Sequence, residues 1–350
     1  MPRGPFLPLT LLPVLAVALL PVAAAGQSEP APGAERTVPE HTRFDLERAD
    51  IAAFADHMVT LGMSREAVYK VLGKAEPQPK IIEAMSKPAE KSLAWWEYRA
   101  RFLDDARIDA GARLWREHRE LFDAIAMERH VQPEYVLGIL GVETYFGRLM
   151  GRYRVLDALT TLAFDYPARG EYFRHELEQF LLLTRDRALD PLTALGSYAG
   201  AMGAAQFMPS SFQHFAVDED GTGQRNLWTD WADIFGSVAN YLQQHGWEYG
   251  QPVMAEAALG SAPAPEMPTN VTLDTTLGAL REHGMQVATT LDDATACLAI
   301  PAALSAGVSY RVGFRNFYVI TRYNRSPLYA MAVNDLAQAI AARVLAPDAP

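Results

Sequence analysis

The sequence predicts a mainly helical protein of the α+β class, and three observations support this prediction. Apolar residues recur at spacings of three and four along much of residues 44–252, which is typical of amphipathic helices. In residues 253–312 the pattern changes to prolines and alternating segments, which indicates short strands. Of the 350 residues 49% are hydrophobic and one, Cys297, is a cysteine, so stability must come from apolar cores and not from an intramolecular disulfide.

These patterns, with the composition of the first 43 residues, divide the chain into six segments. They are a signal peptide over residues 1–25, a flexible leader over 26–43, an N-terminal helical domain over 44–128, a helical core over 129–252, a small α/β insertion over 253–312, and a return to the core with a closing helix over 313–350. A chain of this length can form two or three domains with a sizeable core.

Residues 1–25 have the pattern of a secretory signal. Arg3 supplies a positive start, an apolar run follows, and Ala23-Ala-Ala offers a small-residue cleavage site. The run contains Pro8 and Pro13 and is short for a membrane span, which favours a cleaved signal over an uncleaved anchor. Because no cysteine lies near the cleavage site to carry a lipid, we expect an exported protein that is not lipidated. The leader after it is rich in Pro, Ala and Glu and has too little apolar content to pack.

The charge balance limits the classes of partner. The formal net charge is −11 at pH 7, which argues against nucleic acid or anionic lipid as the main partner. The sequence contains no Walker loop, dinucleotide fingerprint, paired-cysteine zinc site or His-Glu-x-x-His helix, so nucleotide and zinc chemistry have no support.

Within the N-terminal helical domain, Ser64 offers a cap for a short helix. Further along, Trp95 and Trp96 are adjacent, and two neighbouring aromatic rings cannot both face one helical core. Paired tryptophans can stack on sugar rings, but packing in a core is the more frequent use of such side chains. Both interpretations of the tryptophan pair stay open.

The segment Val136-Leu-Gly-Ile-Leu-Gly-Val-Glu-Thr-Tyr-Phe-Gly147 is apolar apart from one carboxylate, Glu143. Pro133 suits the first turn of a helix, and Gly147 is expected to end it. Burial among apolar neighbours disfavours the charged form and predicts a raised pKa for Glu143, as a general acid in glycoside cleavage needs. The alternative is a structural ion pair with Arg148, Arg152 or Arg154.

Three glycines, Gly196, Gly200 and Gly203, repeat at spacings of four and three. On a helix they would form a strip almost free of side chains, which lets backbone or ligand approach closely. Gln206 follows, and Pro209 is expected to open another helix. A buried amide needs partners at both ends, which a sugar can supply; a backbone neighbour within a tight helix packing is an equal alternative.

Together these segments resemble the lytic murein transglycosylases, and within them the membrane-bound lytic transglycosylase B group. The matching motifs extend over about residues 98–333 and are Gly141-Val-Glu-Thr-Tyr-Phe-Gly147, Ser197-Tyr-Ala-Gly-Ala-Met-Gly203, Gln206-Phe-Met-Pro-Ser-Ser211, Ser237-Val-Ala-Asn-Tyr241, Gly246-Trp247, Gly313-Phe-Arg-Asn-Phe-Tyr318, Tyr323-Asn324 and Tyr329-Ala-Met-Ala-Val333. Several ordered motifs of this length are far more specific than one glutamate.

The resemblance implies a lysozyme-like helical catalytic core in a periplasmic enzyme that cleaves the MurNAc-GlcNAc β-1,4 bond of peptidoglycan. By this resemblance Glu143 protonates the glycosidic oxygen and then takes the proton of the muramoyl C6 hydroxyl, which attacks its own C1 and leaves a 1,6-anhydro end. A hydrolase with two carboxylates needs a second acid about 5 to 9.5 Å away, whereas an internal nucleophile needs none. Asp157 and Asp165 are the nearby candidates in sequence, and a cap or a surface position explains each equally well.

The resemblance also implies further residues that line the glycan cleft, where a tyrosine offers a ring for stacking and a hydroxyl for a sugar oxygen. They are Tyr98, Arg169, Ser197, Tyr198, Gln206, Tyr241, Tyr323, Asn324 and Tyr329. Close relatives can place two arginines after the proline of the Tyr-Pro turn, and here the first is Ala168. We therefore expect weaker contact to the stem peptide.

Residues 218–224 follow the start of a calcium loop, with Asp at the first and third places and Gly at the sixth. No Glu occupies the twelfth place, and a plain Asp/Gly turn is the alternative. Some relatives bind one calcium here, which implies a structural calcium and no cofactor for the chemistry. The ligand set would be Asp218, Asp220, Thr222 and Gln224, completed by Asp233 or Asp230.

Two other functional classes remain open from the sequence: a lysozyme-type hydrolase of the same bond, and a non-catalytic peptidoglycan-binding protein. In each case the partner would be the peptidoglycan glycan strand. We expect a monomer that also meets proteins of cell-wall synthesis or remodelling.

Overall fold

The computed structural model describes residues 43–86, 93–186 and 189–345. The predicted signal peptide, and the leader up to residue 42, lie outside these ranges. Within them, every helix is too short or too polar to cross a lipid bilayer.

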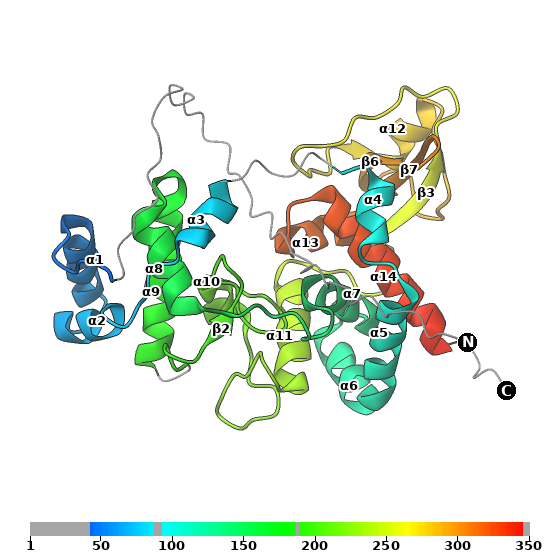
Figure 1. Cartoon of the computed structure of the whole chain (residues 1–350). Helices are drawn as coiled ribbons and strands as arrows, with labels where there is room; N and C mark the ends of the chain where they lie inside the picture. Colours follow the sequence, from blue (N-terminus) through cyan, green and yellow to red (C-terminus); the bar gives the residue numbers. More distant parts are fainter. Residues whose placement is uncertain (1–42, 87–92, 187–188, 346–350) are drawn as a thin grey trace, which may run out of the picture.

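The described chain is mainly helical, as the sequence predicts (Figure 1). Its strands form a five-stranded sheet and the two-stranded pair β1-β2. The helices are α1 (Ala49–Thr60), α2 (Arg65–Leu72), α3 (Pro79–Ser86), α4 (Trp95–Ala100), α5 (Asp105–Glu117), α6 (Arg119–Arg129), α7 (Pro133–Thr144), α8 (Val155–Asp165), α9 (Gly170–Arg185), α10 (Pro209–Phe215), α11 (Trp231–Gln244), α12 (Leu277–Glu282), α13 (Arg315–Tyr323) and α14 (Pro327–Leu345), with a 3₁₀ turn η1 (Pro167–Arg169). The strands are β1 (Tyr153–Arg154), β2 (Leu195–Gly196), β3 (Met254–Ala258), β4 (Thr275–Thr276), β5 (Gln286–Val287), β6 (Ala296–Ala303) and β7 (Val308–Gly313).

The helices form two groups that α10 and α11 connect (Figure 1). At one end α1 to α3 lie with α8 and α9, and at the other α5, α6 and α7 pack with α14. The helices of residues 44–128 therefore contribute to both groups, because α3 packs on α8 while α5 packs on α14 and α6 on α11.

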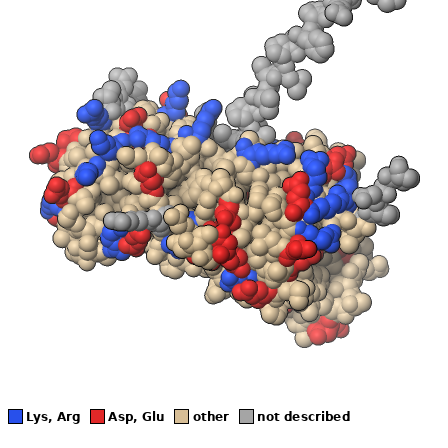
Figure 2. Space-filling view, turned by 90° about the horizontal axis from the view of Figure 1, so that it is seen from below, with Lys and Arg blue, Asp and Glu red and all other residues tan. Residues whose placement is uncertain are grey.

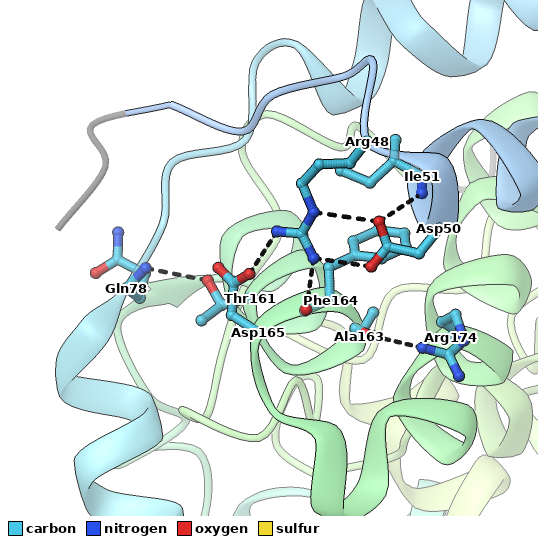
Figure 3. Close-up of polar contacts among 9 residues, drawn as sticks. All are labelled: Arg48, Asp50, Ile51, Gln78, Thr161, Ala163, Phe164, Asp165 and Arg174. Atoms are coloured by element: carbon cyan, nitrogen blue, oxygen red, sulfur yellow. Dashed lines mark hydrogen bonds and ion pairs between the residues drawn. The ribbon is translucent and has the colours of Figure 1, made fainter. Parts of the chain in front are cut away.

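Arg48 fixes the start of α1 to the end of α8 (Figure 3). Its guanidinium donates to Asp165 Oδ1 at 2.7 Å, to the Phe164 carbonyl at 2.7 Å and to Asp50 Oδ2 at 2.8 Å. The Asp165 side chain is 4% exposed, so this ion pair joins the two helices where salt screens it little. Next to it, the Gln78 N–H donates to Thr161 Oγ1 at 3.0 Å and attaches the start of α3 to α8.

The short strands that the alternating pattern predicts lie between Met254 and Gly313 and form a sheet. Its five strands have the order β4-β6-β7-β3-β5, with each neighbouring pair antiparallel. The sheet has a separate small core, to which Leu277 of α12, Cys297 of β6 and Val312 of β7 contribute. The single cysteine is therefore a buried packing residue.

The predicted helix over the glycine repeat is wrong. Residues 195–208 form a folded loop with bridges from Met202 to Gly196 and to Phe207. Gly200 and Gly203 have φ of +85° and +65°, a region that favours glycine. A Cβ at Gly203 would lie 2.3 Å from the Leu227 carbonyl oxygen, so this glycine permits close backbone packing but not along a helix.

Two glycines bring α7 and α14 together. A Cβ at Gly138 would lie 2.7 Å from the Val333 carbonyl oxygen of α14, and a Cβ at Gly141 would lie 2.7 Å from Leu336 Cδ2. Small residues at these places allow the two helix backbones to approach closely. This contact places the last turn of α7 beside the first turn of α14.

Gly138→Ala should lower the free energy of unfolding by about 1–2 kcal/mol, because the clash with a backbone carbonyl outweighs the gain of about 1 kcal/mol in helix propensity. Gly141→Ala is the matched control, since its Cβ would meet side chains that can move, and it should cost less. Urea denaturation of both variants measures the difference. A Gly138→Ala protein as stable as the parent would contradict the packing argument.

Candidate active site

A cavity of about 230 Å³ lies where α7, α9, α13 and the loop of residues 195–208 meet. Five of the residues expected from the sequence line it, namely Glu143, Gln206, Tyr241, Tyr323 and Asn324. Its other lining residues are Tyr172, Glu176, Ala201, Phe207, Met208, Ser210, Ser211 and Arg322, for which the sequence analysis made no prediction.

Glu143 lies in the last turn of α7, and its carboxyl has Tyr329 of α14 as its partner. The Tyr329 hydroxyl donates to Glu143 Oε1 at 2.7 Å. Burial raises the pKa of Glu143 to about 7, and the hydrogen bond from Tyr329, which favours the charged form, opposes that shift. The side chain remains partly open to the cavity. The carboxyl therefore holds its proton near neutral pH while it faces a space that a ligand can enter, as the sequence predicted for its pKa.

The ion-pair alternative for Glu143 is wrong for Arg148 and Arg154. The Arg148 guanidinium lies over the Tyr145 ring, 4.8 Å from its centroid, and Arg154 donates to Asp157 at 2.7 and 2.8 Å. Arg152 is exposed. Among the described contacts, no cation pairs with the carboxyl to lower its pKa.

Tyrosine side chains surround the Glu143 carboxyl. Burial and the nearby negative charge of Glu143 raise the pKa of Tyr98, Tyr323 and Tyr329, so these hydroxyls stay protonated. Tyr323 donates its hydroxyl to the Ala205 carbonyl. Tyr241 donates to the Arg322 carbonyl at 2.7 Å, and burial raises its pKa as well. The hydroxyl protons of Tyr241 and Tyr323 are therefore used by backbone carbonyls, and the rings are what these residues contribute to the cavity. The two ring centroids lie 4.8 Å apart.

The chain leaves α7 through three left-handed residues, which corrects the expected helix end at Gly147. The helix stops at Thr144, and Tyr145, Phe146 and Gly147 have φ of 52°, 55° and 76°. Two non-glycine residues in this region cost roughly 1–2 kcal/mol each, so the surroundings must hold them. The buried Arg107 does so in part, since its guanidinium lies 4.7 Å from the Tyr145 ring centroid.

Thr144 joins this bend to the loop that carries Gln206. Its hydroxyl accepts from the Gly147 N–H at 2.9 Å and donates to the Ala204 carbonyl at 2.8 Å. Gln206 is itself left-handed, with φ of 50°. The residue next to Glu143 therefore positions the opposite wall of the cavity.

Gln206 and Asn324 are held by backbone groups. The Gln206 amide nitrogen donates to the Met150 carbonyl at 3.1 Å and to the Gly203 carbonyl at 2.8 Å. Both amide protons are used in this way, which leaves the amide oxygen as the acceptor that can face a ligand. Asn324 Oδ1 accepts from the Ser326 N–H at 3.1 Å, so its amide NH₂ is the donor toward the cavity.

Five predicted cleft residues do not line the cavity. Two of them, Tyr98 and Tyr329, lie beside the Glu143 carboxyl instead. The other three lie elsewhere. Arg169 lies in η1 and stacks over Tyr172, 4.5 Å from the ring centroid, so it reaches the cavity through that ring. Ser197 accepts backbone N–H groups within its own loop, at 3.1 Å from Ala201. Tyr198 follows it and is half-buried.

The cavity contains a second carboxylate that the sequence analysis missed. Glu176 on α9 is 2% exposed and accepts from the Ser210 N–H at 2.9 Å and from its hydroxyl at 2.8 Å. Because Met208, which precedes α10, has no side chain that can cap it, Glu176 caps that helix from outside. The sequence pattern could have predicted a buried acid, since Glu176 lies between Phe173 and Phe180 on the apolar face of α9.

The two acids that the sequence suggested as second carboxylates lie elsewhere. Asp157 binds Arg154 and accepts the Glu76 N–H at 2.9 Å, and Asp165 binds Arg48. Neither lines the cavity. Both are structural anchors for the N-terminal helices on α8.

The predicted calcium loop brings carboxylates together between α10 and α11. Ligand oxygens of Asp218, Asp220 and Asp233 lie within 4.8 Å of one another. The Thr222 N–H lowers the pKa of Asp220, whereas burial raises that of Asp233. Asp230 instead caps α11, because its Oδ1 accepts from the N–H groups of residues 232 and 233.

The geometry of this loop suits a hard cation, which prefers several carboxylate oxygens. Thr222 approaches Asp218 and Asp220 through its backbone, and Gln224 is exposed. Seen from below, acidic side chains gather near the middle of the molecule (Figure 2), the part from which the loop between α10 and α11 projects in Figure 1.

A protonatable, largely buried glutamate that faces an aromatic and polar cavity in a helical core is suited to general acid catalysis of glycan cleavage. Residues 47–338 match the family model of the transglycosylase SLT domain. The chain belongs to this family and is a peptidoglycan lytic transglycosylase of the lysozyme-like type, as its motifs predict.

Individual relatives support the assignment. The membrane-bound lytic murein transglycosylase B of Escherichia coli (strain K12) is 39% identical over 298 residues, which are 82% of this chain and 81% of that protein. The soluble lytic transglycosylase SltB1 from Pseudomonas aeruginosa is 44% identical, with a TM-score of 0.78 over 83% of this chain and 98% of that one. Slt35 of Escherichia coli, solved in complex with calcium, is 38% identical. Its TM-score is 0.79, and the match covers 87% of this chain and 97% of that one.

Glu143→Gln should flatten the dependence of stability on pH. Between about pH 4.5 and pH 7 the folded protein keeps a proton that the unfolded chain releases, so the free energy of unfolding falls as pH rises. The variant has no carboxyl to ionise here, so its free energy of unfolding should not fall in this way. At pH 8 it should exceed that of the parent by on the order of 1–3 kcal/mol, whereas at pH 4 it should not exceed it.

Urea denaturation of both proteins across this pH range measures the effect. Glu117→Gln, a change at an exposed residue of α5, serves as the control and should follow the parent. If the free energy of unfolding changed with pH in the same way in the parent and in Glu143→Gln, the folded state would not raise the pKa of Glu143.

Proposed function

We propose that Glu143 is the single acid and base of the reaction and that the product carries a 1,6-anhydromuramoyl end. The observation that carries the proposal is the Glu143 carboxyl with a pKa of about 7, bound to Tyr329 at 2.7 Å and facing the cavity. A group with this pKa can donate a proton and later accept one near neutral pH.

In the first step the Glu143 carboxyl gives its proton to the glycosidic oxygen between MurNAc and GlcNAc. The C1–O4 bond breaks, and its electron pair stays with the leaving oxygen. The carboxylate then takes the proton of the C6 hydroxyl while O6 bonds to C1, which restores the acid and consumes no water. The Tyr329 hydroxyl, which remains protonated, would stabilise the carboxylate between the two steps.

The state of the second acid favours this route over hydrolysis with two carboxylates. Both oxygens of Glu176 accept from Ser210 to cap α10, so the group is already used in the fold. A nucleophile or base opposite Glu143 would have to give up that cap. An internal hydroxyl of the substrate requires no such group.

We further propose that the rings of Tyr241 and Tyr323, which line the cavity, and of Tyr98, which lies near Glu143, stack on sugar faces. Gln206 and Asn324 would bind sugar oxygens or amides. Arg169, Ser197, Tyr198 and Tyr329 complete the set, with Arg169 the group for a muramoyl or peptide carboxylate. SltB3 of Pseudomonas aeruginosa, which is 27% identical, was solved with NAG-anhNAM-pentapeptide, and this supports a glycan with an anhydro end as a ligand of the same fold.

We propose that one calcium ion stabilises the loop between α10 and α11 without a part in the chemistry. Asp218, Asp220 and Asp233 would hold it, with Thr222 and Gln224 as the remaining members of the predicted set. We also propose that the enzyme is exported to the periplasm without a lipid and works as a monomer on glycan strands, beside proteins of cell-wall synthesis or remodelling.

Glu143→Gln should lower turnover of purified sacculi by at least about 10³-fold, because the amide cannot donate the proton. Glu176→Gln makes the same change on another wall of the cavity and should keep turnover within about tenfold while it weakens the cap of α10. Mass spectrometry of the released muropeptides, with the reaction run in ¹⁸O-water, measures both rate and product.

Anhydro ends without ¹⁸O are the expected product. Reducing muramic acid ends that carry ¹⁸O would show hydrolysis. Full activity of Glu143→Gln, or equal losses in the two variants, would overturn the assignment of the acid.

Calcium at saturating concentration should raise the melting temperature by a few degrees and leave specific activity unchanged, because the ion binds the folded loop and not the unfolded chain. Asp220→Asn should abolish this shift. Ser64→Ala is the matched control, since it removes the cap of α2, outside this loop, and should lower stability equally with and without calcium. A melting temperature that does not respond to calcium would refute the site.

A further inference from the structure

A second groove lies on the side of α4 away from Glu143, between α4 and the turn that joins β6 to β7. Its volume is about 400 Å³, and Trp96, Arg99, Leu304, Ser305, Ser309 and Arg311 line it. The volume is in the range of pockets that hold small ligands. The groove is separate from the cavity of Glu143, with which it shares no lining residue.

The adjacent tryptophans of the sequence have different roles here. Trp95 is 2% exposed and packs beneath Arg311, whose guanidinium lies 5.3 Å from the Trp95 ring centroid. Trp96 is 45% exposed and forms a wall of the groove. Leu304 on the opposite wall is 43% exposed. An indole held open to solvent across from a small apolar side chain is suited to one face of a sugar ring.

Polar groups surround this apolar wall. Asp335 of α14 holds both guanidinium groups of the groove, with Arg311 at 2.9 and 3.2 Å and Arg99 at 3.3 Å. The Arg99 side chain remains 48% exposed, so several of its N–H donors are open to a ligand. Ser305 and Ser309 add hydroxyls. Hydroxyls and guanidinium donors around an exposed ring match the hydroxyls, amides and carboxylates of a muramoyl glycan.

The groove and the cavity of Glu143 are connected through α4. Tyr98, two residues after Trp96, lies close enough to Glu143 for that charge to raise its pKa. Two residues turn a helix by about 200°, so the two side chains leave α4 on opposite sides. A polymer that passes Tyr98 can therefore meet Trp96 on the far side of the same short helix.

We propose that this groove is a second, non-catalytic binding site for a saccharide unit of the peptidoglycan strand, a proposal that rests on the substrate class of the function above. A protein partner is the less suitable occupant. Its interface would bury about 800 Å² on each side, whereas the exposed apolar groups here are Trp96, Leu304 and the neighbouring Val308. Binding at two sites on one strand raises the affinity for long glycans and leaves short ones unaffected.

Trp96→Ala tests the site. In the Glu143→Gln background, which prevents digestion, its binding to purified sacculi should weaken by about three- to tenfold in a sedimentation assay. In the active background, kcat/KM for a soluble peptidoglycan tetrasaccharide should not change. Trp96→Phe should restore most of the binding. Met127→Ala removes an exposed side chain of α6 that is 74% exposed and should bind as the parent does.

A second variant acts from the other wall. Leu304→Glu places a negative charge in the exposed turn and should weaken sacculus binding because the free carboxylates of the stem peptides on the strand are also negative. Unchanged sacculus binding in both variants would overturn the proposal and leave the groove to a protein partner. Equal losses on sacculi and on the tetrasaccharide would also overturn it, since the groove would then belong to the catalytic cleft. Failure of the proposed chemistry would appear separately, as anhydro-free products of the unmodified enzyme.

Discussion

The structure depends on the close contact between α7 and α14, which puts the Tyr329 hydroxyl on the Glu143 carboxyl. Gly138 and Gly141 permit that approach, because a Cβ at either would meet α14 at 2.7 Å. This contact affects the pKa of the Glu143 carboxyl in two opposite directions. Burial between the helices favours the neutral acid, and the hydrogen bond of 2.7 Å favours the anion, with a resulting pKa of about 7.

The same region stores backbone strain at the residues that follow the acid. Tyr145, Phe146 and Gln206 are left-handed without being glycine. Arg107 lies over the Tyr145 ring, and the Gln206 amide donates to the Met150 carbonyl. Thr144 links Tyr145 and Phe146 to the loop of Gln206 through the Ala204 carbonyl. A rigid connection between acid and opposite wall keeps the cavity open in one shape, which supports the positioning that glycan cleavage requires.

Outside the cavity, acids and arginines mostly hold the fold together. Asp157 and Asp165, which the sequence offered as a second catalytic carboxylate, attach the N-terminal helices to α8. Glu176 caps α10. This agrees with our proposal that Glu143 alone exchanges the proton. The exposed Trp96 on the far side of α4 gives the short helix two different surfaces, one toward the acid and one toward solvent.

The helical class, the small sheet, the family and the burial of Glu143 could all be predicted from the sequence, because hydrophobic period, proline placement and ordered motifs are local properties. The prediction of a helix at the glycine repeat was wrong, since a helix and a folded loop can have the same glycine spacing. The sequence also yielded no prediction for Glu176. Only the tertiary structure decided which polar groups meet. Tyr329 is 186 residues from Glu143 and Ser210 is 34 from Glu176, and contacts over such separations follow from how helices pack.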